Sequence, residues 1–200
     1  ERIRGYSKDL ELKDFDVLTG TIQDLVIRYE KDERPFLLEI DMFYDSKVIT
    51  TKLDNVSLND HPCEYHMGRL CIQADGEVIF CSVLDTVFGD IRSAGSVEKA
   101  ANTNSMYKWE YLELKDLACA KCKYLKICGA GCRAHARSLT HELLGPDPLS
   151  CGLIPRFYDK IVPILSKEAQ DFYYKQVDPD GASPLLKGKN LVELITSGKK

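Results

Sequence analysis

The sequence predicts an α+β fold, in which a cysteine-rich middle with a β-hairpin and short helices is flanked by longer helices. Three observations carry this prediction. Apolar residues recur at helical spacing near the start of the chain, an Asp-Gly pair separates two alternating runs within 69–81, and all eight cysteines lie beyond residue 60. The chain has 200 residues, 44% of them hydrophobic, which is enough to bury a core.

The first expected element is an amphipathic helix that begins at Thr21 and ends before Pro35. Four apolar residues fall there at i, i+3, i+4 and i+7: Ile22, Leu25, Val26 and Tyr29. Alternating apolar residues predict strands over 38–42 and 48–53. The polar segment 54–62 is expected to be a loop, and we place a domain boundary there.

A β-hairpin is expected next, because the Asp-Gly pair at 75–76 lies between two alternating runs. A two-residue turn at this pair would place Ile72 opposite Ile79. Side chains alternate between the two faces of a strand, so Cys71 and Cys81 would then project from opposite faces. On this register the two thiols should not share one metal centre.

The rest of the chain is expected to be mainly helical. Helices are predicted over 96–110, 133–144 and 155–176, and Cys151 is expected in a loop between the last two. Trp109, the sole tryptophan, is interpreted as a packing residue. The histidines are expected at the surface rather than in a metal site: His61, His66, His135 and His141.

Four cysteines lie within fourteen positions, separated by two, five and three residues: Cys119, Cys122, Cys128 and Cys132. Thiolates favour soft or borderline metals, and a CxxC turn lets two sulfurs reach one centre. A zinc ribbon would need a second CxxC pair, which the sequence lacks. The bacterial ferredoxin pattern requires proline after its last cysteine, where this chain has Arg133.

Seven cysteines and one glycine give a longer pattern that begins at Cys63 and ends at Cys151. In order it reads Cys63, Gly76, Cys81, Cys119, Cys122, Cys128, Cys132 and Cys151. This spacing resembles the SPASM domain, the auxiliary iron–sulfur domain found after the barrel in radical SAM enzymes that modify peptides and proteins. The resemblance covers about half of the chain.

The resemblance implies two auxiliary [4Fe–4S] clusters. Carried over to this chain, the second cluster would be held by four residues: Cys119, Cys122, Cys128 and Cys151. The first would be held by Cys63, Cys81 and Cys132. Its fourth position varies among relatives: it is either open to substrate or held by a further residue, for which Cys71 is the candidate here despite the register above.

The resemblance also implies a domain organisation and a missing part. Residues 1–60 would be the closing segment of a radical SAM barrel, 61–155 the SPASM domain, and 156–200 a C-terminal helix and tail. The CxxxCxxC loop of radical SAM enzymes does not occur in this sequence. We therefore expect S-adenosylmethionine and a third cluster to bind upstream of Glu1, and this chain to be inactive alone.

The reaction class follows from the same resemblance. Sulfatase-maturing relatives carry an Asp directly after the cysteine that corresponds to Cys81, and here that residue is Ser82. Thioether or carbon–carbon crosslinking of a ribosomal peptide is therefore favoured, with a sulfatase-maturase-like enzyme as an alternative. The implied partners are a peptide or protein substrate and an electron donor such as flavodoxin or ferredoxin.

Two other kinds of protein remain possible from the residues alone. One is a binding module whose loops are held by zinc or a cluster, and the other is a ferredoxin-like electron carrier. Residues 115–137 contain six Lys or Arg residues and one Asp. This local excess of positive charge would stabilise an anionic cluster.

Composition excludes several classes. The net charge of −4 argues against nucleic-acid binding, and no apolar run reaches the ~18–20 residues of a membrane span. Sparse cysteines without a secretory signal favour the cytoplasm.

Overall fold

A computed structural model of the chain describes residues 14–33, 38–40, 44–45, 56–63, 70–81, 83–84 and 86–186. The fold is α+β, as predicted. Its elements up to the cysteine run are α1 (Phe15–Lys31), β1 (Glu39–Ile40), β2 (Tyr44–Asp45), β3 (Cys71–Ile72), β4 (Glu77–Ile79), β5 (Val87–Asp90), α2 (Ile91–Ala94), α3 (Val97–Ala101), α4 (Asn104–Glu110) and the 3₁₀ turn η2 (Leu114–Asp116).

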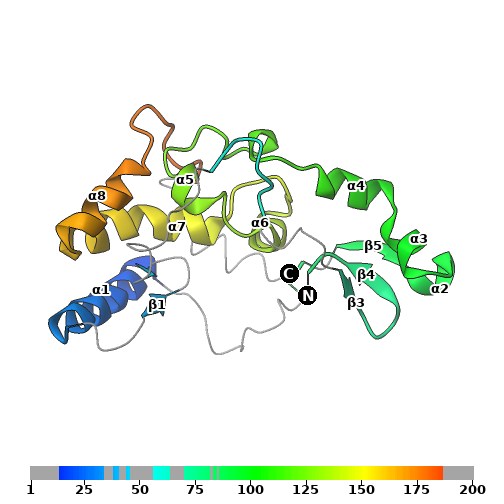
Figure 1. Cartoon of the computed structure of the whole chain (residues 1–200), viewed down its shortest axis with the longest axis horizontal. Helices are drawn as coiled ribbons and strands as arrows, with labels where there is room; N and C mark the ends of the chain where they lie inside the picture. Colours follow the sequence, from blue (N-terminus) through cyan, green and yellow to red (C-terminus); the bar gives the residue numbers. More distant parts are fainter. Residues whose placement is uncertain are drawn as a thin grey trace.

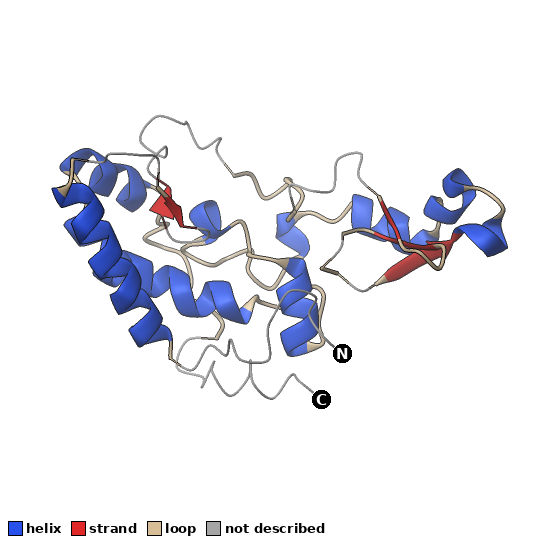
Figure 2. Ribbon diagram, turned by 90° about the horizontal axis from the view of Figure 1, so that it is seen from below, coloured by secondary structure: helices blue, strands red, loops and turns tan. Residues whose placement is uncertain are grey.

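The second half contains α5 (Leu125–Cys128), α6 (Arg133–Thr140), α7 (Pro148–Arg156), the π-helical turn η3 (Phe157–Ile161), the 3₁₀ turn η4 (Val162–Ile164) and α8 (Lys167–Lys175). The molecule is elongated (Figures 1 and 2). The helices α1, α7 and α8 form one end, the three-stranded sheet and α2 to α4 form the other, and the cysteine-bearing segment around α5 and α6 lies between them.

Helix α1 begins six residues earlier than the expected start at Thr21. Asp14 is its N-cap, because its carboxylate accepts from the backbone N–H groups of Asp16 and Val17. The hydroxyl of Thr21 instead donates to the backbone oxygen of Val17 within the helix. The first turn is held by tertiary packing as well, since Phe15 is buried.

A hydrophobic core at the helical end joins α1 to the C-terminal helices. We call it the helical core, and its buried members are Phe15, Ile22, Val26, Tyr29, Tyr124, Leu153, Ile154, Phe157, Tyr158, Ile161, Val162, Leu165, Ala169, Tyr173 and Leu186. The expected helix over 155–176 is interrupted: α7 passes into η3 and η4, and the chain bends at Leu165 before α8. Cys151 lies within α7, so the predicted loop at this position is wrong.

The hairpin exists, but its turn is one residue longer than predicted. Gln73 pairs with Glu77, since the N–H of Gln73 donates to the backbone oxygen of Glu77 (2.8 Å). Cys71 then lies opposite Ile79 and Ile72 opposite Val78. The predicted pairing of Ile72 with Ile79 is therefore wrong by one position.

With this register, Cys71 and Cys81 are no longer expected on opposite faces of the hairpin. Residues directly opposite each other in an antiparallel pair project from the same face, so Cys71 shares a face with Ile79. Strand β4 ends at Ile79, and Cys81 lies in the bend that follows it. Opposite faces for Cys71 and Cys81 no longer follow.

A second hydrophobic core lies between the sheet and the cysteine run. We call it the sheet core, and its buried members are Phe80, Leu84, Phe88, Trp109, Leu112, Leu114, Leu117, Cys119, Leu125, Ala130 and Ala134. Trp109 is 3% exposed, so its interpretation as a packing residue is confirmed. The helix expected over 96–110 is divided into α3 and α4, and that expected over 133–144 ends at Thr140.

The remaining predictions in the first half are only partly covered. Strand β1 lies within the predicted strand 38–42, while the predicted strand 48–53 lies outside the described residues. His66 and Ser82 also lie outside them. The domain boundaries at 60 and 155 stay a prediction.

Candidate metal centre

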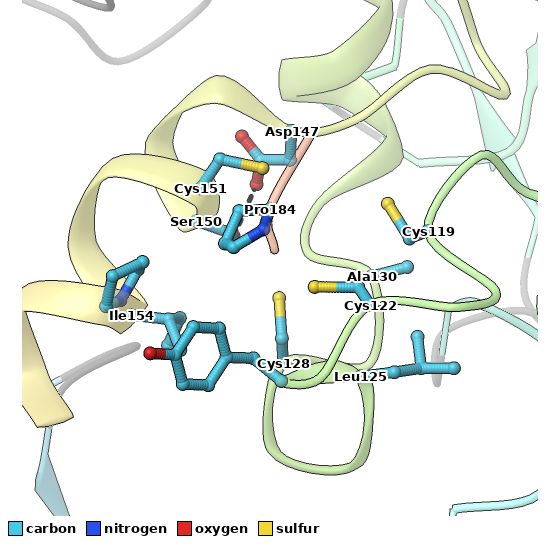
Figure 3. A pocket seen from close by; sticks show the side chains of 12 residues that line it. Cys119, Cys122, Leu125, Cys128, Ala130, Asp147, Ser150, Cys151, Ile154 and Pro184 are labelled. Atoms are coloured by element: carbon cyan, nitrogen blue, oxygen red, sulfur yellow. Dashed lines mark hydrogen bonds between the residues drawn. The ribbon is translucent and has the colours of Figure 1, made fainter. Parts of the chain in front are cut away.

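Four cysteines line one cavity: Cys119, Cys122, Cys128 and Cys151. We call this the four-cysteine site. Cys119 and Cys122 lie on a tight turn, in which the N–H of Cys122 donates to the backbone oxygen of Cys119 (2.8 Å). Cys128 ends α5 and Cys151 lies in α7. Their sulfurs surround a common space in Figure 3.

The four thiols surround this space without meeting at one point. The cavity measures about 340 Å³, counting the part open to solvent. Among the residues that the structure describes, no three His, Cys, Asp or Glu side chains approach closely enough to hold a single metal ion. Tetrahedral zinc would draw thiolates to about 3.8 Å from one another, given Zn–S bonds of about 2.3 Å. A multi-iron cluster allows wider spacing, since its thiolates bind different irons.

Burial holds two of these thiols, Cys128 and Cys151, in the neutral form by raising their pKa values. It raises the pKa of Cys128 to about 12, with the charge of Asp147 as the next cause. It likewise raises the pKa of Cys151 to about 12, helped by the neighbouring Cys119. Thiolates are disfavoured in such a low-dielectric setting unless a cation accompanies them. A metal centre would supply that positive charge. These cysteines therefore suit a metal whose binding releases the protons of the thiols.

The C-terminal segment 178–186 crosses the four-cysteine site, and we call it the strap. Ala182 donates its N–H to the backbone oxygen of Lys121 (2.6 Å) and accepts from the N–H of Lys123 (2.9 Å). Pro184 lines the cavity, and the backbone N–H of Leu186 donates to the thiol of Cys151. The strap therefore covers the turn that carries Cys119 and Cys122.

The strap approaches this turn so closely that one position requires glycine. A Cβ at Gly181 would lie 2.5 Å from the Cα of Lys123.

Three other cysteines each pack against the sheet core, as Cys122 also does: Cys63, Cys81 and Cys132. We call them the three-cysteine set. Cys132 does not line the cavity of the four-cysteine site, although it completes the CxxCx5Cx3C run. Burial raises the pKa of Cys132, and the nearby Cys81 contributes to this rise. The N–H of Leu84 donates to the sulfur of Cys81 (3.3 Å).

His61 holds the backbone of Cys63 in place. Its Nδ1 accepts from the N–H of Cys63 (3.0 Å), and its Nε2 lies 2.9 Å from the backbone oxygen of Trp109. Nε2 therefore carries the proton and donates to Trp109. The histidines were expected at the surface, but His61 and His135 are only partly exposed, with 17% of the His135 side chain accessible. His141 is exposed.

Asp147 links the two groups of cysteines. Its carboxylate is fully buried and accepts from the N–H of Cys132 (2.9 Å) and from the hydroxyl of Ser150 (2.7 Å), while it also caps α7. Burial alone would raise the pKa of Asp147, but nearby His135, Ser150 and the Cys132 N–H hold it below its ordinary value. One carboxylate thus fixes both the loop of Cys132 and the helix of Cys151.

Two buried donors have no acceptor in the described part of the chain, Trp109 Nε1 and Arg133 Nε. The Nδ1 of His135 lies 3.5 Å from the carboxylate of Asp147. Buried polar groups are nearly always hydrogen-bonded, so the two orphaned nitrogens indicate a missing partner. The inorganic sulfides and thiolates of an iron–sulfur cluster are acceptors of this kind, and the residues present therefore fit such a group.

Comparisons with protein-family models, with curated proteins and with solved structures give no match to this chain. No helix in its described part is both long enough and apolar enough to cross a membrane.

Sequence reasoning did not single out Asp147, Ser150, His61 or the strap. For Asp147 a signal was present, because an Asp directly before Pro148 is typical of a helix start.

Proposed function

We propose that this chain is the auxiliary-cluster region of a radical SAM maturase that modifies a ribosomal peptide or protein. The four-cysteine site would hold one [4Fe–4S] cluster, and the three-cysteine set would hold the other. When bound, such clusters supply a place for the electron left after radical bond formation and help to position the substrate. The part of the enzyme that cleaves S-adenosylmethionine would be supplied by sequence upstream of Glu1.

One observation supports the proposal: Cys151, rather than Cys132, lines a cavity with the other three cysteines of the CxxCx5Cx3C run. Cys151 joins Cys119, Cys122 and Cys128 around one cavity, although it is distant in sequence. Cys132 does not line that cavity, and it lies close enough to Cys81 for the two thiols to interact electrostatically. A single zinc site built from the CxxCx5Cx3C run would instead have kept Cys132 and excluded Cys151.

The chain's own residues prepare both positions. The strap and α7 form part of the wall of the four-cysteine site, and the backbone N–H of Leu186 donates to Cys151. Hydrogen bonds to ligating sulfur stabilise its charge and tune the reduction potential. Around the three-cysteine set, His61 and Asp147 fix the backbones of Cys63 and Cys132.

Anaerobic reconstitution with iron and sulfide, followed by metal analysis, tests the proposal. We expect about eight irons per chain, as two four-iron clusters require, and reversible reduction in a redox titration. Stoichiometric zinc without iron, or bound metal that shows no accessible one-electron couple, would instead establish a structural binding module. The Cys71→Ala variant serves as a check that iron is not held by arbitrary thiols, because it should keep the second cluster intact.

A further inference from the structure

The guanidinium of Arg133 is a permanent positive charge in a buried position. This residue is 2% exposed, and an arginine side chain cannot lose its proton at any physiological pH. No carboxylate of the described residues forms an ion pair with it. Buried charges in proteins are paired with an opposite charge or bound to a metal centre, because an isolated ion is costly to remove from water.

The hydrogen bonds of Arg133 fix its position without neutralising it. Its terminal nitrogens donate to three backbone carbonyls, those of Leu143 (3.1 Å), Gly145 (2.7 Å) and Ala130. Carbonyl oxygens are dipoles and carry no net charge. The third nitrogen, Nε, is buried and lacks any acceptor. Both the charge and one donor of this side chain therefore lack a partner.

Arg133 does not itself line the four-cysteine site but is hydrogen-bonded to a residue that does. It follows Cys132 directly at the start of α6, and one of its acceptors, Ala130, lines the cavity of that site. Its positive charge opposes the effect of burial on the pKa of Cys119, which is nevertheless raised. Two kinds of negative charge line this cavity: the buried carboxylate of Asp147, which pairs with His135 rather than with Arg133, and the thiolates with whatever they bind.

We propose that Arg133 is the internal counter-ion of the centre held by the four-cysteine site, and that its Nε–H donates to a sulfur of that centre. The inference rests on the proposed function and deepens it. A fixed positive charge stabilises the reduced, more negative state of the centre and so raises its reduction potential. Arg133 is thus a positioning residue for electron acceptance.

Two substitutions of Arg133 distinguish the effect of its charge from the effect of its hydrogen bonds to the backbone. Arg133→Gln removes the charge, whereas Arg133→Lys keeps it, and both lose most of the carbonyl hydrogen bonds. We expect Arg133→Gln to lower the reduction equilibrium constant of this centre about tenfold, which is about 59 mV for one electron. Arg133→Lys should move it much less, while both variants unfold at similarly reduced denaturant concentrations.

Arg137→Gln is the matched control. Arg137 lies one turn further along α6, is exposed, and donates to the backbone oxygen of His141. Removal of an exposed charge is screened by solvent, so the potential should stay unchanged. The inference fails if Arg137→Gln lowers the potential as much as Arg133→Gln, if the Lys and Gln variants lower it equally, or if neither variant moves it.

A measurement on the unsubstituted arginine covers the case in which these variants do not fold. Protein grown with guanidino-¹⁵N arginine, carrying Cys81→Ala to remove the other cluster, should show ¹⁵N hyperfine coupling to the reduced centre. Lack of coupling contradicts the assignment of Nε–H to the cluster. Failure of the proposed function is distinct, because it shows as missing iron or a missing couple in the wild-type chain.

Discussion

The four-cysteine site and the three-cysteine set are built in different ways. The first takes its cysteines from the CxxC turn, α5 and α7 and is covered by the strap. The second takes Cys63, Cys81 and Cys132 from three separate segments that meet on the sheet core. The first thus has four cysteines around one cavity, while the second has three cysteines and no assigned fourth ligand. A closed centre suits electron storage, and an incomplete one suits contact with substrate.

The largest effect is expected where both groups of cysteines depend on one residue. Asp147→Ala leaves the N–H of Cys132 and the hydroxyl of Ser150 without their acceptor and removes the cap of α7. We expect a loss of roughly 2–4 kcal/mol in the free energy of unfolding of the metal-free chain, and reduced iron at both centres. Urea unfolding and iron analysis measure the two quantities.

Asp171→Ala is the control for that variant, because Asp171 is an exposed carboxylate paired only with Lys167 on α8. Its expected cost is below about 0.5 kcal/mol. Loss of iron at one centre alone in Asp147→Ala would show that the carboxylate does not link the two.

Gly181→Ala should affect the four-cysteine site alone. The added methyl group would lie 2.5 Å from the Cα of Lys123, so the strap must move away at a cost of about 1–3 kcal/mol. We expect a chelator to remove iron faster from the second cluster and at an unchanged rate from the first. Equal rates at both clusters would mean that the strap does not shield this site. Gly20→Ala, where no atom lies within 4 Å, is the control.

Cys71→Ala should affect the three-cysteine set alone, and by less. The observed register places Cys71 on the same face as Ile79, next to the bend that carries Cys81, so it is available as the fourth ligand. We expect a changed electron paramagnetic resonance spectrum for the first cluster only, with a stability change below about 1 kcal/mol. An unaltered spectrum would establish that the fourth position is open or held by another group.

The smallest effect is expected for the substitution Asp16→Asn, which should leave both clusters unchanged. Arg156 donates to this carboxylate from α7, and with Lys160 it lowers the pKa of Asp16 from 3.8 to about 2. A lowered pKa stabilises the folded state above 3.8, and this contribution disappears as the pH falls towards about 2. The difference in urea midpoint between wild type and Asp16→Asn, in metal-free protein at low salt, should therefore be small at pH 7 and vanish at pH 2. A difference that persists there would refute the ion pair as its cause.

Local patterns in the sequence were sufficient for the existence of the hairpin and of the main helices. These patterns did not predict features that depend on tertiary contacts, such as the register of the hairpin and the start of α1. An Asp-Gly pair does not determine how many residues the turn contains, and the pairing of Gln73 with Glu77 moved every cross-strand partner by one. The start of α1 was missed because Thr19, a polar residue, occupies a fully buried position in its apolar stripe.

The candidate site shows the same limit. Spacing alone can suggest which cysteines belong together, but it does not show that Asp147 and Arg133 lie buried beside them. Each of these charged residues is held by groups ten or more positions away in sequence, including the carbonyl of Leu143 for Arg133 and the N–H of Cys132 for Asp147. Such contacts have no local signature.

The central claim is that Cys132 and Cys151 serve different centres. Reconstituted Cys132→Ala and Cys151→Ala proteins, compared by iron content and electron paramagnetic resonance, test it most directly. We expect Cys151→Ala to perturb the same signal as Cys119→Ala, and Cys132→Ala to perturb the signal that is altered in Cys81→Ala. If Cys132→Ala and Cys119→Ala perturb one signal and Cys151→Ala perturbs the other, the account is wrong.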